Sequence, residues 1–359
     1  MSFALFFHLG GDIDLLAPFL GQSDACGRPR VIVAEKLLAA NPRLSIALGA
    51  HACAPHVILA QDADKNALRA ALEGARVLLT ASETTLRPHR LAHALTLEAN
   101  AMGLRTFTMQ HGVENVGLTY FDEYQGTDVT FASSHVLTWN GLANIPSKAA
   151  DGTRKKVIDA GLVVNDPAMF APWRAKLAQR LGVARLTVGV FENLHWTRFS
   201  DDYRRRFLDD LQATADALPG VRFLLKPHPE GRWLTERFGG ARPQGDNILL
   251  IDPADPLGRL LTAPDLMPLA DCVITTPSKT ALDAALAGAP VAVAAYDGAY
   301  ACYPALRTLA SAEDWRKFVN LAAVGAPDLQ ERNRKFAAAT VSSVNGRDNI
   351  LSLVRETLA

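Results

Sequence analysis

The chain has 359 residues, of which 49% are hydrophobic and 21% charged, and its 37 basic and 37 acidic side chains cancel. A chain of this length predicts two domains of about 150 to 180 residues, each with its own core. The charge balance excludes a bulk electrostatic affinity for nucleic acid and a membrane attachment by charge alone.

The cysteines and the apolar runs limit the cellular setting of the chain. Cys26, Cys53, Cys272 and Cys302 are far apart and form no C-x-x-C pair. They predict neither a zinc site nor a disulfide framework, so we expect a reducing cytoplasm. For the chain as a whole we expect no metal and no cofactor. No uncharged apolar run reaches the roughly 18 residues of a spanning helix, so we expect at most a peripheral contact with the inner face of a membrane.

The first half of the chain alternates short apolar runs with Ala- and Leu-rich segments of helical spacing. Its first run, in MSFALFFHLGGDIDLL, lacks the basic region of a signal peptide and carries Asp12 and Asp14 where a cleavage region would lie. It therefore predicts a buried strand. Continuous apolar runs such as ARVLLTAS and LRTFTMQHG, between helical segments, are typical of parallel strands covered on both faces.

The pattern restarts after the charged helical segment PWRAKLAQRLGVA. RLTVGVFEN, VRFLLKPHP, NILLID, DCVITT and PVAVAAY read as strands, with helices such as DDYRRRFLDDLQATADAL between them. The sequence therefore predicts an α/β fold of two doubly wound, Rossmann-like domains, at 1–170 and 180–335. We expect a terminal helical region at 336–359 to cross back to the domain junction.

Open parallel sheets bind ligands beyond the carboxyl ends of their strands, so residues that follow strands are the first candidates. In LLKPHPEGRW, Lys226 and His228 sit in a turn made rigid by two prolines. This presentation suits an anion, but a surface turn would look the same. Glu192 and Asn193 follow another strand, either as site residues or as parts of a capped loop.

A hydroxyl-rich turn leads from the strand DCVITT into the helix SKTALDAALAG, at Thr276, Ser278 and Thr280. A helix start offers free N–H groups and a positive dipole, which predicts a phosphate site. The alternative is that Ser278 is only an N-cap. Its pairing with Lys226 and His228 on one domain edge favours a diphosphate or phosphodiester pocket.

In the first half, His111 ends a strand in a turn made tight by Gly112. An imidazole titrates near neutral pH, so His111 is a candidate general base, and the alternative is a loop histidine bonded to backbone. Asp12 is a second candidate, as an acceptor for a substrate hydroxyl group. Asp12 and Asp14 also spell a weak D-x-D metal pattern.

Further candidates follow the first and fourth predicted strands. Gly10 and Gly11 would let a ligand or another loop approach the backbone closely. Glu83 and Arg87 could line an acceptor site, or belong only to a capped loop. We assign no role to the remaining histidines of the first half, which are His8, His51, His56, His89, His93 and His135. P-loop, zincin and nucleophile-elbow motifs are absent from the sequence.

Taken together, MQHG, KPHP and ADCVITTPSKTALDAALAGAPVAV resemble a glycosyltransferase of the GT-B type. Within that type, their order is similar to the CDP-glycerol glycerophosphotransferases of teichoic acid synthesis, the capsule Kdo transferases and the HP-motif sialyltransferases. The resemblance implies two Rossmann-like domains that face a central cleft, the first for the acceptor and the second for the nucleotide donor. It also implies CMP or CDP as the leaving group and a role in polysaccharide biosynthesis.

The family motifs fall on particular residues of this chain. The histidine–glycine pair falls on His111 and Gly112, which implies that His111 is the catalytic base. The K/R-P-H-P motif implies that His228, beside Lys226, meets the donor phosphate. The Ser/Thr-rich turn and its following acid fall on Thr276, Ser278, Thr280 and Asp283.

The chain departs from the family pattern at several positions. Gln110 stands where an aromatic residue is common, and Ala270 and Asp271 stand where Ser-Asp is common. The sialyltransferases and Kdo transferases often use an acid as base, which brings Asp12 and Glu83 into consideration.

The resemblance implies inverting, metal-independent transfer to a glycan or a lipid-linked glycan, with fixed donors stabilising the departing nucleotide. Two alternatives remain. A non-hydrolysing sugar-nucleotide 2-epimerase would bind a nucleotide on a related scaffold, and a non-catalytic partner protein would keep the fold alone.

Overall fold

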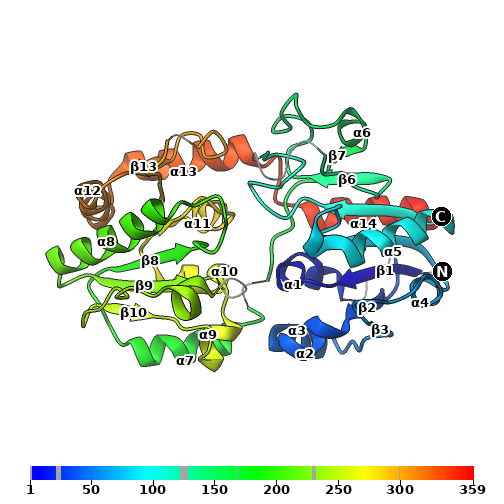
Figure 1. The fold of residues 1–359 in the computed structure, drawn as a ribbon, viewed down its shortest axis with the longest axis horizontal. Helices are drawn as coiled ribbons and strands as arrows, with labels where there is room; N and C mark the ends of the chain where they lie inside the picture. Colours follow the sequence, from blue (N-terminus) through cyan, green and yellow to red (C-terminus); the bar gives the residue numbers. More distant parts are fainter. Residues whose placement is uncertain (1, 22–25, 122–127, 167, 229–231, 299) are drawn as a thin grey trace. The chain divides into compact units, whose positions relative to one another are not determined.

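The computed structural model describes residues 2–21, 26–121, 128–166, 168–228, 232–298 and 300–359. The chain divides into two compact units, each of which is described by itself. Unit 1 comprises Met1–Asp166 and Thr340–Ala359, and unit 2 comprises Pro167–Ala339. Each unit contains one parallel sheet with helices packed around it (Figure 1).

Unit 1 contains a seven-stranded sheet of order β3-β2-β1-β4-β5-β6-β7, in which every pair is parallel. Its strands are β1 (Ser2–Phe7), β2 (Arg30–Ala34), β3 (Val57–Leu59), β4 (Ala75–Thr80), β5 (Arg105–Met109), β6 (His135–Thr138) and β7 (Val157–Asp159). The strand order reverses between β1 and β4, which is the topological switch point of the sheet. All of β1 except its first residue is buried, which confirms the buried first strand.

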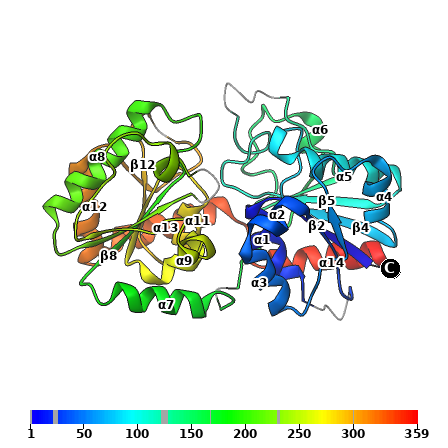
Figure 2. The same cartoon turned by 60° about the horizontal axis from the view of Figure 1, so that its bottom comes forward.

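The helices of unit 1 connect these strands, and α4 lies beside α5 (Figure 2). They are α1 (Gly10–Leu16), α2 (Glu35–Ala40), α3 (Pro42–Ala50), α4 (Lys65–Ala71), α5 (Arg90–Ala101), α6 (Asp151–Arg154) and α14 (Gly346–Leu358), with short 3-10 helices η1 (Ala17–Phe19) and η2 (Arg87–His89). The last helix, α14, follows unit 2 in the sequence but belongs to unit 1, where it packs against β4.

Unit 2 contains a six-stranded parallel sheet of order β10-β9-β8-β11-β12-β13, with its switch point between β8 and β11. Its strands are β8 (Thr187–Glu192), β9 (Arg222–Pro227), β10 (Ile248–Leu250), β11 (Cys272–Thr275), β12 (Val291–Ala294) and β13 (Arg307–Leu309). The sequence patterns did not predict β13, because a three-residue edge strand carries too short an apolar run.

The helices of unit 2 include the amphipathic pair α8 and α12, which pack together. They are α7 (Ala171–Leu181), α8 (Asp201–Ala217), α9 (Pro256–Leu260), α10 (Ala263–Leu266), α11 (Thr280–Leu286), α12 (Ala312–Ala323) and α13 (Pro327–Thr340), with η3 (Trp233–Arg237) and η4 (Met267–Leu269). The expected domain limit at 336 falls inside α13. In the described part of the chain, no helix has the length and apolar character needed to cross a bilayer.

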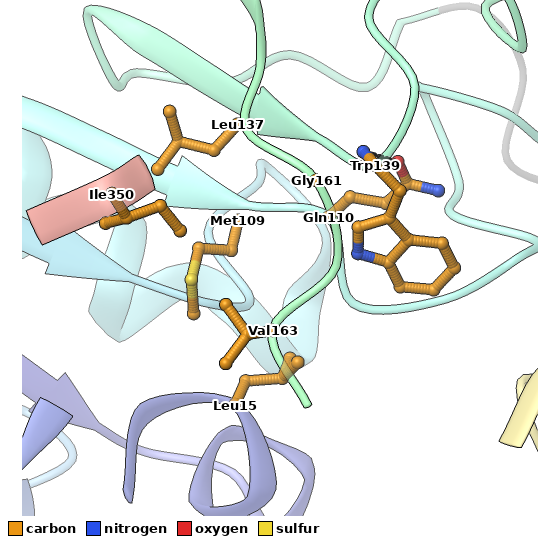
Figure 3. Close-up of a pocket in the computed structure, with 8 residues that line it drawn as sticks. All are labelled: Leu15, Met109, Gln110, Leu137, Trp139, Gly161, Val163 and Ile350. Atoms are coloured by element: carbon orange, nitrogen blue, oxygen red, sulfur yellow. Dashed lines mark hydrogen bonds between the residues drawn. The ribbon is translucent and has the colours of Figure 1, made fainter. Parts of the chain in front are cut away.

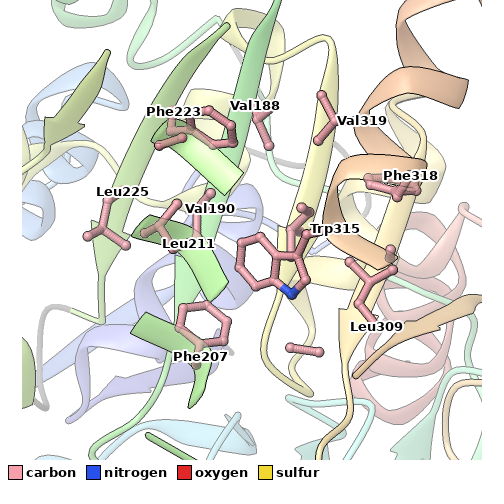
Figure 4. Packing of buried hydrophobic residues seen from close by; sticks show 14 of the residues in the cluster. Val188, Val190, Phe207, Leu211, Phe223, Leu225, Leu309, Trp315, Phe318 and Val319 are labelled. Atoms are coloured by element: carbon pink, nitrogen blue, oxygen red, sulfur yellow. The ribbon is translucent and has the colours of Figure 1, made fainter. Parts of the chain in front are cut away.

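The core of unit 2 forms where α8 and α12 cover the sheet. The Ser200 hydroxyl caps α8 by accepting the Tyr203 N–H at 3.1 Å, and two acidic residues follow in the first turn. The buried face of α8 then meets α12, where the Phe207 and Trp315 rings lie edge to face, 5.3 Å apart. Figure 4 shows these side chains with Val188 and Val190 of β8. This packing holds β8, and therefore the residues that follow it, in place.

We expect Phe207→Ala to lower the free energy of unfolding of unit 2 by about 3–5 kcal/mol, because it leaves a cavity against Trp315. Urea denaturation followed by tryptophan fluorescence measures this change. The control is Val324→Ala, at a side chain that is 78% exposed, with an expected change within about 0.5 kcal/mol. Equal effects of the two substitutions would contradict the core described here.

Candidate functional site

Asp12 lies at the switch point of unit 1 and is completely buried. Its Oδ2 accepts the backbone N–H groups of His8 at 3.0 Å and Leu9 at 2.9 Å, and its Oδ1 accepts the Ser82 hydroxyl at 2.8 Å. Burial by itself would raise the pKa of Asp12, but the nearby His8 side chain and the backbone N–H groups of His8 and Leu9 lower it to about 2. Asp12 is therefore an ionised carboxylate that ties the end of β1 to the end of β4, with both oxygens in use.

Three imidazole rings lie beside this carboxylate. His8 stacks on Phe6, with ring centroids 5.4 Å apart. The ring of His89 stands edge to face with His8 at 6.2 Å and with His111 at 5.7 Å. Burial, His111 and His8 lower the pKa of His89 to about 3, and its Nδ1 lies 2.7 Å from the Thr84 hydroxyl. His89 is therefore neutral at physiological pH.

His111 follows β5, where Asn115 Oδ1 accepts its backbone N–H at 3.1 Å. Its ring donates a hydrogen bond to the carbonyl of Ala81, which follows β4. Burial lowers the pKa of His111, although Asp12 and the bond to Ala81 act in the opposite direction. A neutral imidazole has one N–H, so the bond to Ala81 leaves the other ring nitrogen as an acceptor. His111 is therefore hydrogen-bonded to the backbone, as one of the two alternatives predicts. It still has a second ring nitrogen that can accept, which the general-base alternative requires.

Glu83 is buried and holds the loop that precedes β6. Its carboxylate accepts the N–H of Ala132 at 2.9 Å, the N–H of Ser133 at 3.1 Å and the hydroxyl of Ser133 at 2.9 Å. His93 Nδ1 of α5 lies 2.5 Å from its Oε1. Both oxygens of Glu83 are therefore occupied by contacts within unit 1.

The candidate acceptor residues lie around the same edge of unit 1. Gly10 and Gly11 begin α1, and a Cβ added at Gly11 would meet no atom within 4 Å among the described residues. No loop of the described residues approaches Gly11 that closely, and the approach of a ligand stays a prediction. Arg87 lies exposed in η2. Asp14 forms an ion pair with Arg43.

Gln110 bridges β5 and β6. Its Oε1 accepts the N–H of Trp139 at 3.1 Å, and its Nε2 donates to the Gly112 carbonyl at 3.0 Å. It also lines a small pocket in unit 1 with mainly apolar neighbours such as Met109 and Ile350 (Figure 3). Gln110 therefore fixes the turn that carries His111.

In unit 2, Asn193 joins the ends of β8 and β11 across the switch point. Its backbone N–H donates to Thr276 Oγ1 at 3.1 Å, and its side-chain amide donates to the Pro277 carbonyl at 3.1 Å. The Thr276 hydroxyl donates in return to Asn193 Oδ1. The two predicted donor-site residues are thus in contact and hold the two strand ends together.

Glu192 and Lys226 are charged residues buried at neighbouring strand ends, with 4% and 3% of their surface exposed. The Lys226 amino group donates to the Gly258 carbonyl in α9. The Glu192 carboxylate accepts the backbone N–H groups of Leu194 and His228. Burial raises the pKa of Glu192 to about 7, although both hydrogen bonds and Lys226 act in the opposite direction. Glu192 therefore changes charge near neutral pH.

The rings of His228 and His195 lie tilted against each other, with centroids 4.6 Å apart and an interplanar angle of 36°. Burial, His195 and Lys226 lower the pKa of His228 to about 3. Burial, Arg237 and Arg204 lower the pKa of His195 to about 4. Both rings are therefore neutral at physiological pH, in surroundings rich in positive charge. Within the described residues, the buried Nδ1 of His195 has no hydrogen-bond partner.

The hydroxyl-rich turn leads into α11. Ser278 Oγ accepts the Thr280 N–H at 3.2 Å and lies 3.1 Å from Thr275 Oγ1. Ser278 therefore accepts a backbone N–H at the start of α11, but the N-cap position belongs to Lys279, so the expected N-cap role of Ser278 is wrong by one residue. Its contact with a phosphate stays a prediction. Asp283 forms an ion pair with Lys279, so this acid is neutralised within the helix.

Sequence patterns missed His8 and His89 as members of the unit 1 site. His8 carried a usable signal, because it directly follows a predicted strand and precedes an acid by four residues. His89 carried no such signal in the sequence, because it lies in η2, nine residues after the end of β4. In the described part of the chain, no three His, Cys, Asp or Glu side chains are grouped so as to hold a metal ion.

Comparison with known proteins identifies the fold. No family model and no curated protein matches the sequence. Among solved structures, a putative UDP-N-acetylglucosamine 2-epimerase from Listeria monocytogenes is 12% identical with a TM-score of 0.65, covering 100% of this chain and 96% of that one. The UDP-GlcNAc 2-epimerase from Neisseria meningitidis bound to UDP-GlcNAc is 13% identical with a TM-score of 0.63, covering 100% and 99%.

A further similar structure is the wall teichoic acid polymerase TagF, in its H548A form. It is 12% identical with a TM-score of 0.60, and the match covers 99% of this chain and 89% of TagF. At this level of identity the likeness establishes the fold alone. The chain has a two-domain α/β fold of the GT-B type, which confirms the fold class predicted from the sequence.

We expect the stability of the protein to carry a pH dependence from Glu192. Its folded-state pKa, about 7, lies above the ordinary value of 4.5, so the native protein keeps a proton that the unfolded chain releases between these values. The contribution of Glu192 to the free energy of unfolding is therefore complete below pH 4.5. It is lost as the pH rises through 7, which lowers the free energy of unfolding by on the order of 3 kcal/mol.

Glu192→Gln should remove this dependence, so that the variant gains stability relative to the wild type between pH 5 and pH 8. Urea midpoints at the two pH values measure the difference. Glu331→Gln, at a 41% exposed side chain of α13, is the control and should follow the wild type. If the urea midpoints of Glu192→Gln and the wild type changed equally between pH 5 and pH 8, the raised pKa of the buried Glu192 would be contradicted.

Proposed function

We propose that the chain is a glycosyltransferase of the GT-B type, or a glycerophosphotransferase of the same architecture. It moves a group from a CMP- or CDP-linked donor to a hydroxyl group of a glycan or a lipid-linked glycan in the synthesis of a surface polysaccharide such as a capsule. The work takes place in the cytoplasm, with peripheral contact to the inner face of the membrane. The proposal combines the sequence motifs with the chemistry of the two strand edges.

The observation that carries the proposal is the division of roles at the edge of unit 1. Asp12 and Glu83 have both of their carboxylate oxygens engaged by donors. His111 keeps one ring nitrogen as an acceptor, since its N–H is used by Ala81. The hydroxyl group of the acceptor substrate thus contacts His111. One of the histidine rings at this edge of unit 1 takes the proton of that hydroxyl group. Imidazoles, rather than the two acids, supply the base.

The edge of unit 2 suits a departing nucleotide phosphate. His228 is the group that contacts the phosphate, and Ser278 supplies a hydroxyl donor. Lys226 is nearly buried and donates to Gly258, so it acts mainly through its charge. A phosphate beside the neutral His228 favours the imidazolium, so binding takes up a proton. These donors stabilise the leaving group in an inverting transfer that needs no divalent ion.

A nucleotide-linked substrate is also compatible with the structural neighbours, since the Neisseria epimerase structure contains UDP-GlcNAc. A 2-epimerase would act on the sugar nucleotide itself and would need no acceptor. Incubation of a bound sugar nucleotide without acceptor therefore separates an epimerase from a transferase, because only the epimerase changes it into its isomer.

Thermal unfolding with CMP, CDP, UDP, GDP and ADP, without and with magnesium, tests the donor class. At about 100 times its Kd a ligand stabilises the native state by about 2.7 kcal/mol. We expect stabilisation by CMP or CDP without magnesium, its loss in His228→Ala, and its retention in His135→Ala, since His135 lies at the amino end of β6 in unit 1.

The other outcomes of this experiment have defined meanings. Selective stabilisation by UDP would contradict the cytidine donor and favour the epimerase. The absence of stabilisation by any nucleotide would contradict catalysis and favour a non-catalytic partner protein with the same fold.

A further inference from the structure

His8 is held between two rings at the switch point of unit 1. It directly follows β1, stacks on Phe6 at 5.4 Å and meets the edge of His89 at 6.2 Å. The residue is 8% exposed. Its ring position is therefore fixed by packing on both sides, at the carboxyl edge of the sheet where parallel sheets bind ligands.

Asp12 defines the chemical state of this ring. His8 Nδ1 lies 2.8 Å from Asp12 Oδ2, at ion-pair distance, although the two are not aligned as a regular hydrogen bond. The same carboxylate is immobilised by Leu9 and Ser82. A fixed anion beside Nδ1 favours the tautomer with its proton on Nδ1, which leaves Nε2 as a bare acceptor.

Nε2 of His8 is buried and has no hydrogen-bond partner among the described residues. A buried polar atom without a partner is costly, so a group that donates a hydrogen bond to it would be stabilised there. The His89 ring meets His8 and His111, and the Asp12 carboxylate lies against Nδ1 of His8. The arrangement of carboxylate, imidazole and bare nitrogen is that of an oriented general base.

His8 differs from His111 in what would balance a positive charge. A proton added to His8 places the imidazolium directly against the Asp12 carboxylate. A proton added to His111 leaves its other nitrogen against the neutral carbonyl of Ala81. The geometry therefore gives His8 the better compensated charge, and it leaves His111 as a hydrogen-bond acceptor for a hydroxyl group.

We propose that His8 is a further catalytic residue of unit 1, whose Nε2 takes the proton from the acceptor hydroxyl group, and that Asp12 is its positioning residue. This inference rests on the proposed function for the identity of that group. The O–H bond breaks as an N–H bond forms at Nε2. The acceptor oxygen bonds to the transferred group while the bond from that group to an oxygen of the nucleotide phosphate breaks, and the phosphate leaves with the electron pair of that second bond. The imidazolium then returns its proton to water.

The tautomer of His8 is the first test, and it needs no substrate. Two-bond proton–nitrogen correlation spectra of the full chain at pH 8 show which ring nitrogens carry a proton. Loss of signals in His8→Gln assigns the ring, and its contacts with Phe6 assign it independently. We expect the proton of His8 on Nδ1 in the wild type, and a shift of the population toward Nε2–H in Asp12→Asn. A proton on Nε2 in the wild type would overturn the proposal.

The second test is the rate of transfer with the nucleotide donor that stabilises the wild type. We expect His8→Gln to lower the rate by roughly 10²- to 10⁴-fold, the usual contribution of a general base. The nucleotide-induced thermal shift should remain, because unit 2 is unchanged. His135→Gln, at the opposite edge of the same sheet, is the matched control and should keep the rate of the wild type.

A rate of His8→Gln equal to that of the His135→Gln control would refute the role of His8. Failure of the proposed function has a different signature, because the wild type itself would then show no stabilisation by nucleotide. The thermal shift and the tautomer thus report separately on the donor site and on His8.

Discussion

Parallel pairing is the constraint on which the rest of the molecule depends. Two successive parallel strands cannot be joined by a tight turn, so crossovers connect the strands of each sheet, and the carboxyl ends of its strands gather at one edge. In each unit the strand order reverses once, between β1 and β4 and between β8 and β11. At these two points the following loops diverge to opposite faces of the sheet and leave room for side chains. The chemical groups of the chain concentrate there.

Both switch points are held together by polar side chains that bridge the two strand ends. In unit 1 the bridge is Asp12 with Ser82, and in unit 2 it is Asn193 with Thr276. The bridges differ in charge, since one is an ionised carboxylate and the other a pair of neutral groups. The difference follows from the neighbours, because His8 and backbone N–H groups offset the burial of Asp12. Unit 1 thus holds a fixed negative charge beneath its imidazoles.

Burial controls the protonation of the candidate site more than any single ion pair does. It lowers the pKa of His89, His195 and His228 and raises that of Glu192 to about 7. These three imidazoles are therefore neutral at physiological pH, and each has a ring nitrogen that can accept a hydrogen bond. A ligand that brings negative charge to unit 2 would reverse this balance, so donor binding and proton uptake are coupled in the proposed function.

The sequence by itself determined the fold class and the residues that follow the strands, because apolar runs and strand-end polar residues are local features. His111, His228 and Ser278 could be named from such patterns and from a resemblance in short motifs. The sequence could not show that the carboxylate oxygens of Asp12 and Glu83 accept internal hydrogen bonds. Two of the donors, Ser82 and Ser133, are distant from these acids in the sequence. Only the tertiary structure decided this, because burial and hydrogen bonding depend on which distant segments the crossovers bring together. The same holds for His8, whose role follows from a carboxylate on one side and a bare nitrogen on the other.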